Sequence, residues 1–276
     1  MTAVPPGESS TRLLACLYAS ESQRPLLSAL CALEEEIGAS LKAGLDHSIA
    51  HVRLAWWREE CARCAAGTPC APLTRAIGAH FGAAERSALA GLAGLVEVAA
   101  WDLAAATFAT RRELTAYCER WSAGLIVPFA QFAAPRLDTA SALALGTTLR
   151  AIELLGSLAD DARSGRVRLP LDELEAAQAD PADLLTPPWR AALAAHLARR
   201  HRELRTELSV WVRALPGAAQ PQLRALLVWA RLAVLESQRI ERRLPQPPAA
   251  SDHRGALDGW RAWRAARRAG SGTLVL

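Results

Sequence analysis

The chain has 276 residues, of which 51% are apolar and 22% charged, and its formal net charge at pH 7 is +4. This composition excludes a disordered or fibrous protein and leaves ample apolar material for a large core. Aromatic and β-branched residues are few beside Ala, Leu, Arg and Glu, so we predict an all-α fold rather than a strand-rich one.

The basic residues are almost all arginines, with Lys42 as the only lysine. The segment from residue 239 to residue 268 contains eight arginines and only three carboxylates, whereas the net charge of the rest of the chain is about zero. A dedicated nucleic-acid binder usually spreads a basic face over a recognisable reading motif. Because the total charge is modest and no such motif is present, we expect no nucleic-acid partner.

Six cysteines occur in a chain without a secretory-signal pattern, which favours free thiols in a reducing cytoplasm. Cys61 and Cys64 have the spacing of half a zinc site, with Cys70 and His80 as conceivable further ligands. No second Cys-x-x-Cys pair follows, so we interpret them as structural thiols. No apolar run reaches the roughly 20 residues needed to cross a bilayer. We expect a cytoplasmic protein, soluble or peripheral on the inner face of the membrane.

Apolar residues recur at three- and four-residue spacings along most of the chain, which predicts a succession of helices. Residues 1–10, rich in Pro, Gly and Ser, are expected to be disordered. Asp46 is expected to cap one helix that stops near Gly67. The predicted helices in chain order are two between residues 11 and 41 that are separated near Pro25, then 47–66, 72–80, 84–108, 113–132, 139–162, short helices or a loop over 173–188, then 189–214, 219–243 and 254–269.

The predicted helix at 139–162 is apolar around much of its girth, which is typical of a helix at the centre of a bundle. A Pro-Gln-Pro-Pro run beginning at Pro245 reads as a linker. We therefore predict one helical domain over residues 11–244, followed by a Pro-rich linker and a basic helix over residues 245–276.

An acidic helix end followed by a Gly-Arg turn lies between Leu158 and Leu174, in the run LADDARSGRVRLPLDEL. It resembles the second signature of squalene and phytoene synthases, in which Gly-Arg-x-Tyr-Leu-Pro follows the acidic residues. Three further segments fall in the family's order, namely LSALCALEEEIGAS, RLAWWREE and AWDLAAATFATRRELTAYCERWSAG. The resemblance covers about residues 15–240 and implies a single-domain, all-α isoprenoid synthase bundle.

The resemblance also implies a chemistry. Members of this family couple two prenyl diphosphates head to head, and magnesium ions carry the charge of the departing diphosphate. Magnesium prefers hard oxygen ligands, so two carboxylate-rich helices face one another across an apolar cavity. If this chain is active, the resemblance implies Mg²⁺ as cofactor and an isoprenoid diphosphate as substrate.

The first acidic signature of the family is not preserved. Its paired aspartates correspond to Gly38 and Ala39 in this sequence. The preceding residues Glu34, Glu35 and Glu36 spread over about 200° of helix and cannot all point into one cavity. We expect a solvated acidic stretch, in which Glu36 is the carboxylate that turns inward and a weak metal candidate.

The second signature is preserved in part. Asp161 matches its last aspartate, and Asp160 replaces the glutamate before it. Ser157 occupies the position of its first aspartate. Asp160, Asp161 and Arg166 are the catalytic candidates that the resemblance implies, and the two aspartates are also weak metal candidates. Arg166 is expected to pair with Asp161 or to cap carbonyl groups. With one carboxylate of the set left in place, we expect no magnesium cluster.

Other positions of the family's site carry altered residues. Arg150 and Glu153 replace neutral amides, and Arg168 replaces the tyrosine of Tyr-Leu-Pro. Because Arg150 and Glu153 lie three residues apart, we predict that they pair with each other or with neighbours such as Glu36. They would then fill space that a diphosphate needs.

The remaining substrate-binding candidates follow from the resemblance alone. Arg53 and Arg58 flank a Trp-Trp pair where the family has an arginine near a diphosphate, and the alternative is that they form salt bridges while the tryptophans are core. Tyr117 and Gly124 match the segment that lines the family's cavity. Their presence indicates that the helix packing persists.

Two functions stay open. One is a non-catalytic or diverged member of the family, resembling the branch that includes a mitochondrial complex I assembly factor, which would bind an isoprenoid lipid or a partner protein. The other is an active Mg²⁺-dependent head-to-head prenyltransferase of the squalene or phytoene synthase type. The second function requires Asp160, Asp161, Glu36 and Glu153 to rebuild a ligand set.

The predicted carboxyl-terminal helix combines arginines with tryptophans. Arg261, Arg264 and Arg268 fall on one stripe, and Trp260 and Trp263 lie beside them. Basic residues with interfacial tryptophans can lie on an anionic membrane. The alternative is that both tryptophans dock onto the bundle and the arginines are merely solvated.

Overall fold

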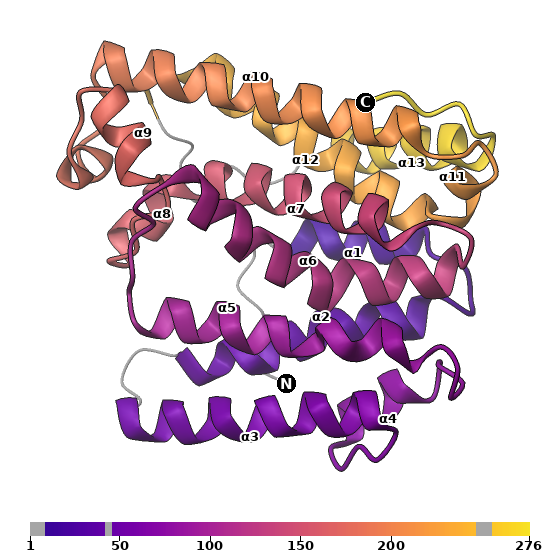
Figure 1. Cartoon of the computed structure of the whole chain (residues 1–276). Coiled ribbons are helices and arrows are strands. Elements are labelled where there is room, and N and C mark those ends of the chain that lie inside the picture. The colour runs from indigo at the N-terminus through magenta and orange to yellow at the C-terminus, as the bar shows by residue number, and fades with distance from the viewer. Residues whose placement is uncertain (1–8, 42–45, 247–255) are drawn as a thin grey trace. The chain divides into compact units, whose positions relative to one another are not determined.

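The computed structural model describes residues 9–41, 46–246 and 256–276, and within these ranges every regular element is a helix (Figure 1). The all-α prediction is confirmed. Residues 1–8 of the segment predicted to be disordered and most of the Pro-rich linker lie outside the described residues. The prediction is wrong for Ser9 and Ser10, which begin the helix α1 (Ser9–Leu17). Within the described part, no helix combines the length and apolarity that crossing a bilayer requires.

The chain divides into two compact units, which we describe separately. Unit 1 comprises Met1–Tyr18, Thr107–Thr115 and Thr148–Leu276, and unit 2 comprises Ala19–Ala106 and Ala116–Thr147. Two long helices, α6 (Arg111–Ala133) and α7 (Thr139–Gly156), each contribute residues to both units. No residue between 141 and 159 is exposed, in agreement with the apolar girth of that segment.

Unit 2 begins with α2 (Arg24–Gly38), which has Pro25 in its first turn, as the sequence indicates. Asp46 caps α3 by accepting a hydrogen bond of 2.7 Å from the Ser48 amide. Gly67 ends that helix with φ at 86°, a conformation that glycine adopts without strain. The elements between α2 and α6 are η1 (Ala39–Leu41), α3 (His47–Ala66), α4 (Pro72–Gly78), η2 (Arg86–Leu92) and α5 (Ala93–Leu103).

Two glycines, Gly94 and Gly124, allow α5 and α6 to pack closely within unit 2. A Cβ on Gly124 would lie 2.6 Å from Leu95 Cγ, and one on Gly94 would lie 2.3 Å from the Arg120 carbonyl oxygen. Only glycine allows this approach. The helix predicted over 84–108 is correspondingly shorter, because its first part is the 3₁₀ turn η2 and its last turn ends at Leu103.

Unit 2 also contains the Cys-x-x-Cys pair. Burial raises the pKa of Cys61 to about 12 and that of Cys64 to about 11. Cys64 donates a hydrogen bond of 3.3 Å to the Thr74 carbonyl oxygen, which joins α3 to α4. The neighbouring Glu60 carboxylate accepts from the amides of Cys70 and Ala71 at 2.8 and 2.7 Å. These contacts support the structural role expected for the thiols.

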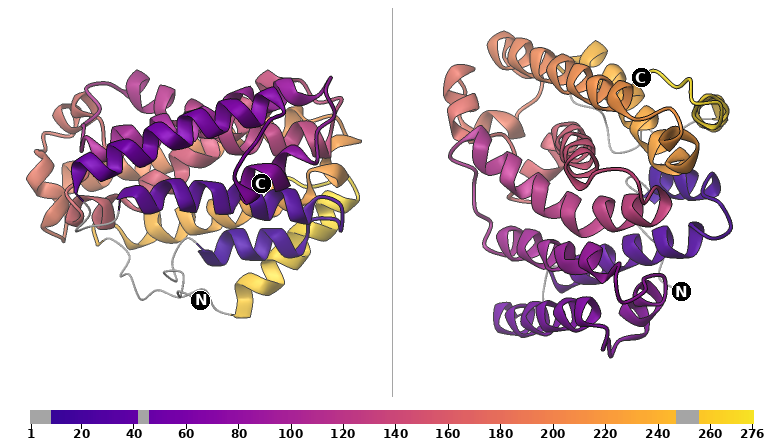
Figure 2. Two further views of the ribbon diagram at one scale, coloured as in Figure 1. Left: turned by 90° about the horizontal axis from the view of Figure 1, so that it is seen from below. Right: turned by 45° about the vertical axis from the view of Figure 1, so that its right-hand side comes forward.

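Unit 1 is organised around α12, which packs against α1, α10 and α13. Leu227 and Trp229 in its first two turns are fully buried. Figure 2 shows α13 at the outer edge of this unit. The elements of unit 1 besides the parts of α6 and α7 are α1 (Ser9–Leu17), α8 (Leu158–Arg163), α9 (Leu171–Ala176), η3 (Pro181–Leu185), α10 (Ala191–Ala214), α11 (Ala219–Gln222), α12 (Arg224–Arg243) and α13 (Ala256–Gly270).

The prediction of a single helix over 139–162 is wrong in one respect. The segment is broken at Ser157 into two helices, α7 and α8. The Ser157 hydroxyl lies 3.2 Å from the Leu154 carbonyl oxygen and donates to the Asp161 carboxylate at 2.6 Å. Serine side chains that bond to nearby groups in this way compete with the helical ladder. The break places Asp160 and Asp161 in the first turn of a separate short helix.

Candidate functional site

Asp161, the aspartate preserved from the second signature, lies on α8 in unit 1. Its side chain is only 12% exposed. It accepts the Ser157 hydrogen bond, and the Nε atoms of Arg166 and Arg168 lie 3.4 and 3.6 Å from its Oδ1. Gly165, with φ at 78°, turns the chain so that both arginines return to this carboxylate. The expected pairing of Arg166 with Asp161 is confirmed.

Asp160 points elsewhere. Its side chain is 56% exposed and pairs with Arg163 on the same helix. Adjacent helical residues differ by about 100° in direction, so the two aspartates do not converge. Divalent metal sites need several oxygens directed at one point. Because Asp161 is neutralised by two guanidinium groups and Asp160 is turned to solvent, this donor set does not fit Mg²⁺.

A second cluster lies on the last turns of α7. Arg150 Nη1 pairs with Glu153 Oε2 at 3.1 Å, as the three-residue spacing predicts. Arg12 of α1 lies 3.7 Å from the same oxygen, and the Trp229 indole donates to Glu153 Oε1 at 2.7 Å. The Arg12 guanidinium also lies 5.0 Å from the centre of the Trp229 ring. Both oxygens of Glu153 are therefore already engaged.

A third charged cluster, centred on Glu173 of α9, was not anticipated from the sequence. This buried carboxylate accepts from Arg111 Nε at 2.8 Å and lies 2.8 Å from His196 Nε2 and 3.2 Å from Arg200 Nε. The partners of Glu173 come from α6 and α10, which are distant from α9 in the sequence. No local spacing signals such a cluster.

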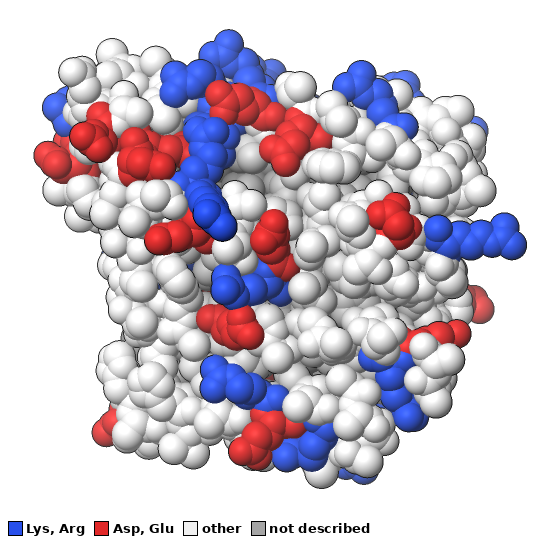
Figure 3. Space-filling view, in the orientation of Figure 1, with Lys and Arg blue, Asp and Glu red and all other residues white. Residues whose placement is uncertain are grey.

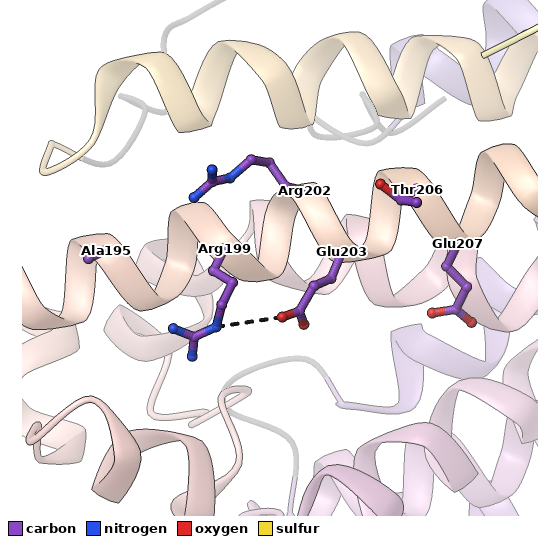
Figure 4. Close-up of a pocket in the computed structure, with 6 residues that line it drawn as sticks. All are labelled: Ala195, Arg199, Arg202, Glu203, Thr206 and Glu207. Atoms are coloured by element: carbon purple, nitrogen blue, oxygen red, sulfur yellow. Dashed lines mark ion pairs between the residues drawn. The ribbon is translucent and has the colours of Figure 1, made fainter.

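Two cavities lie beside the Glu173 cluster in the described part of unit 1, and one is small and the other shallow. An enclosed cavity beside Arg168, Glu173 and Arg200 holds about 20 Å³, which suits about one water molecule rather than a lipid. A wider groove of about 740 Å³ lies along α10. Figure 4 shows Arg199, Glu203 and Glu207 on one side of this helix, with Arg199 and Glu203 paired at 3.5 Å.

The α10 groove is polar, and charges of both signs are mixed around it. Figure 3 shows acidic and basic side chains interspersed over α9 and α10. Ion pairs at such exposed positions contribute little to stability. Within unit 1, the enclosed cavity is lined mostly by leucines but is too small for an isoprenoid tail, and the α10 groove is lined mainly by charged side chains.

In unit 2, Glu34 is the carboxylate of the first acidic stretch that turns inward. Its Oε1 accepts a hydrogen bond of 2.6 Å from the Trp121 indole. Glu36 is exposed, so the expectation that it turns inward is wrong. The angular position of Glu34 lies inside the arc of Leu27 and Leu30, whereas that of Glu36 lies outside it. The sequence already contained this signal.

The other candidates of unit 2 have structural contacts. Tyr117 is buried and donates its hydroxyl hydrogen to Asp102, with both carboxylate oxygens at 3.1 Å. Gly124 is the close contact with α5 described above. On α3, Arg53 is half-buried and Arg58 exposed, and neither has an ion pair among the residues that the structure describes.

The structure thus groups the candidates by unit. Arg150 and Glu153 meet in one cluster and Asp161 and Arg166 in another, both in unit 1, while Asp160 stands apart. Glu36, Arg53, Arg58, Tyr117 and Gly124 belong to unit 2. Over residues 9–41, 46–246 and 256–276, no three His, Cys, Asp or Glu side chains form a metal-binding group.

Comparison with known proteins decides the family. The model of the family described as "Squalene/phytoene synthase" matches residues 6–251. The chain belongs to the squalene/phytoene synthase family. The resemblance of the sequence to this family is thereby confirmed. Active members of the family normally depend on Mg²⁺.

Solved structures of similar fold agree with this squalene/phytoene synthase assignment. A dehydrosqualene synthase crystallised in complex with a ligand has a TM-score of 0.77 at 15% identity, covering 96% of this chain and 92% of that one. The squalene synthase HpnC from Alicyclobacillus acidocaldarius has a TM-score of 0.66 at 19% identity, covering 85% and 89%. No curated protein sequence matches the chain. The isoprenoid synthase fold is therefore confirmed.

Proposed function

We propose that this chain is a diverged, non-catalytic member of the squalene/phytoene synthase family that binds an isoprenoid lipid. The observation that carries the proposal is the state of Asp161, which is held by Ser157, Arg166 and Arg168. A carboxylate already neutralised by two arginines is a poor magnesium ligand, because the arginines repel the cation. The family's diphosphate departure depends on that metal.

The cluster on α7 supports the same proposal. Glu153 could extend a ligand set only if it left Arg150, Arg12 and Trp229. Removing a mostly buried carboxylate from two arginines would leave their charges uncompensated, which is costly. The contacts of Glu153 therefore support a structural role for this cluster, not a role in metal binding.

Isoprenoid binding is supported by the fold, since a structural neighbour is a dehydrosqualene synthase in complex with a ligand. A partner protein is the other occupant we consider, by analogy with the branch of the family that includes a mitochondrial complex I assembly factor. We further propose a cytoplasmic location, in keeping with a sequence that has six cysteines and that resembles no secreted disulfide framework.

The test has two arms. Mass spectrometry of small molecules retained by the purified chain should find an isoprenoid lipid. Incubation with farnesyl or geranylgeranyl diphosphate and MgCl₂, followed by extraction, should yield no coupled product. A known active squalene synthase treated in parallel shows that the assay works. Coupled product from the wild-type chain would overturn the proposal, and an extract without isoprenoid would favour the partner protein.

The competing function is an active Mg²⁺-dependent prenyltransferase. The exposed carboxylate of Asp160 favours it, because Asp160 could turn toward a metal by breaking only a surface pair with Arg163. In that case Asp160→Asn would abolish product formation, whereas Glu175→Gln on the exposed surface of α9 would not.

A further inference from the structure

The helix α13 has two faces of different character. Its inner side is made of Ala262, Ala265, Ala266 and Ala269, all buried, and α13 packs on α12. Its outer side carries Trp260 and Trp263, which are 51% and 46% exposed. The alternative left open by the sequence, in which both tryptophans dock onto the bundle, is therefore wrong.

The inner side is anchored at both ends. The buried Asp258 accepts from Arg261 Nη1 at 3.0 Å and pairs with Arg239 of α12. After the helix, the Leu274 amide donates to Gln220 Oε1 at 3.0 Å. Arg261 thus belongs to the anchored side, not to the exposed stripe that the sequence suggested. The outer face is held in place by these contacts.

The outer face combines indole rings with guanidinium groups. Arg264 lies 4.6 Å from the centre of the Trp260 ring and Arg267 lies 5.1 Å from that of Trp263. With Arg268 and Leu257, which is 65% exposed, these residues form what we call the Trp-Arg face. The face covers about 140° of the helix circumference, opposite the alanines. A shallow hollow of about 440 Å³ lies among its tryptophans and arginines.

The positive charge of this face is not neutralised by neighbours. Among the described residues, Arg264, Arg267 and Arg268 have no ion pair with a carboxylate. Burial lowers the pKa of Arg231 on α12, and the charges of Arg268, Arg261 and Arg264 lower it further. A cluster of like charges that is maintained on a folded surface is complementary to an anionic partner.

We propose that the Trp-Arg face binds the surface of an anionic lipid bilayer. Tryptophan rings prefer the boundary between headgroups and acyl chains, where an apolar body and a polar N–H are both accommodated. Arginines beside them contact lipid phosphates, and each contributes to binding near an anionic surface. Helices that bind a membrane through tryptophans, leucines and basic residues lie in the membrane plane. The helix α13 is then parallel to that plane.

Vesicle flotation with the full-length chain tests the proposal, using vesicles of phosphatidylcholine alone and vesicles that also contain phosphatidylglycerol. The wild-type chain should bind the anionic vesicles more strongly. Arg264→Gln combined with Arg267→Gln should weaken that binding about 30-fold. The matched control is Arg75→Gln with Arg112→Gln, which removes the same charge from exposed positions elsewhere and should change binding little.

A second variant separates the tryptophans from the charges. Trp260→Ser with Trp263→Ser should reduce binding to both kinds of vesicle, because it removes the interfacial rings. Circular dichroism checks that each variant is folded. Failure of the wild-type chain to bind anionic vesicles would overturn the proposal, and so would equal loss in the control variant. Capture of a protein through this face in the absence of vesicle binding would likewise overturn it.

Discussion

Ser157 donates a hydrogen bond of 2.6 Å to Asp161, one helical turn further along the chain. A hydroxyl at this position gives the carboxylate a donor, where an aspartate would have given a metal a second oxygen ligand. Arg166 and Arg168 add two positive charges at 3.4 and 3.6 Å from the same carboxylate. The surroundings of Asp161 are therefore those of a paired carboxylate and not those of a metal ligand.

This relationship predicts the response to magnesium. MgCl₂ should not raise the melting temperature of the wild-type chain beyond the effect of an equal ionic strength of NaCl. Ser157→Asp with Arg168→Tyr restores a carboxylate pair at i and i+4 and removes one guanidinium, so it should acquire stabilisation by MgCl₂. Differential scanning calorimetry measures both. A magnesium-dependent increase in the wild-type chain would contradict the account given for Asp161.

The cluster around Glu153 predicts a large loss of stability on truncation. Glu153→Ala leaves Arg12 and Arg150 without their shared carboxylate, so the free energy of unfolding should fall by about 3–5 kcal/mol. Glu97→Ala removes the partner of Arg120 in a half-exposed pair and should cost under about 1 kcal/mol. Urea unfolding distinguishes the two, and equal losses would show that Glu153 has no special role.

Packing at Gly124 predicts a further effect. Gly124→Ala would place a Cβ 2.6 Å from Leu95 Cγ and force α5 and α6 apart, which should destabilise the chain by about 1–3 kcal/mol. Gly38→Ala is the matched control, since no atom lies within 4 Å of the added Cβ. It should be neutral or stabilising by up to about 1 kcal/mol. Comparable destabilisation by both would contradict the close contact.

His201 predicts a dependence of stability on pH. Burial lowers its pKa from 6.5 to about 4, and the charges of Arg205 and Arg200 act in the same direction. Between these two pKa values the unfolded chain binds more protons than the folded one, so stability falls as pH decreases from about 6.5 to about 4. The full loss is about 3 kcal/mol. It is complete below the pKa of the folded state.

Urea midpoints between pH 7 and pH 4 measure this effect. His201→Gln removes the titrating group, so its midpoint should change less over this interval than that of the wild-type chain. His51→Gln on the exposed surface of α3 is the control and should keep the wild-type slope. An unchanged slope in His201→Gln would place the proton uptake at another group.

Local features of this protein could be predicted from the sequence. Asp46 caps α3, Gly67 and Gly165 end helices with positive φ, and Arg150 pairs with Glu153 three residues away. Each of these depends on groups within one or two helical turns, where spacing alone decides which atoms meet. The order of the acidic and Gly-Arg segments was likewise enough to indicate the family.

Only the tertiary structure decided which groups surround the candidate carboxylates. Arg12 and Trp229 reach Glu153 from helices far away in sequence, and Arg111 and His196 reach Glu173 in the same way. Spacing along one helix carries no information about partners on another. The exposure of the Trp-Arg face was decided in the same manner, because the alanines of α13, not its tryptophans, fit closely against α12. Burial of one side of a helix depends on what it packs against, and that is settled only when the chain folds.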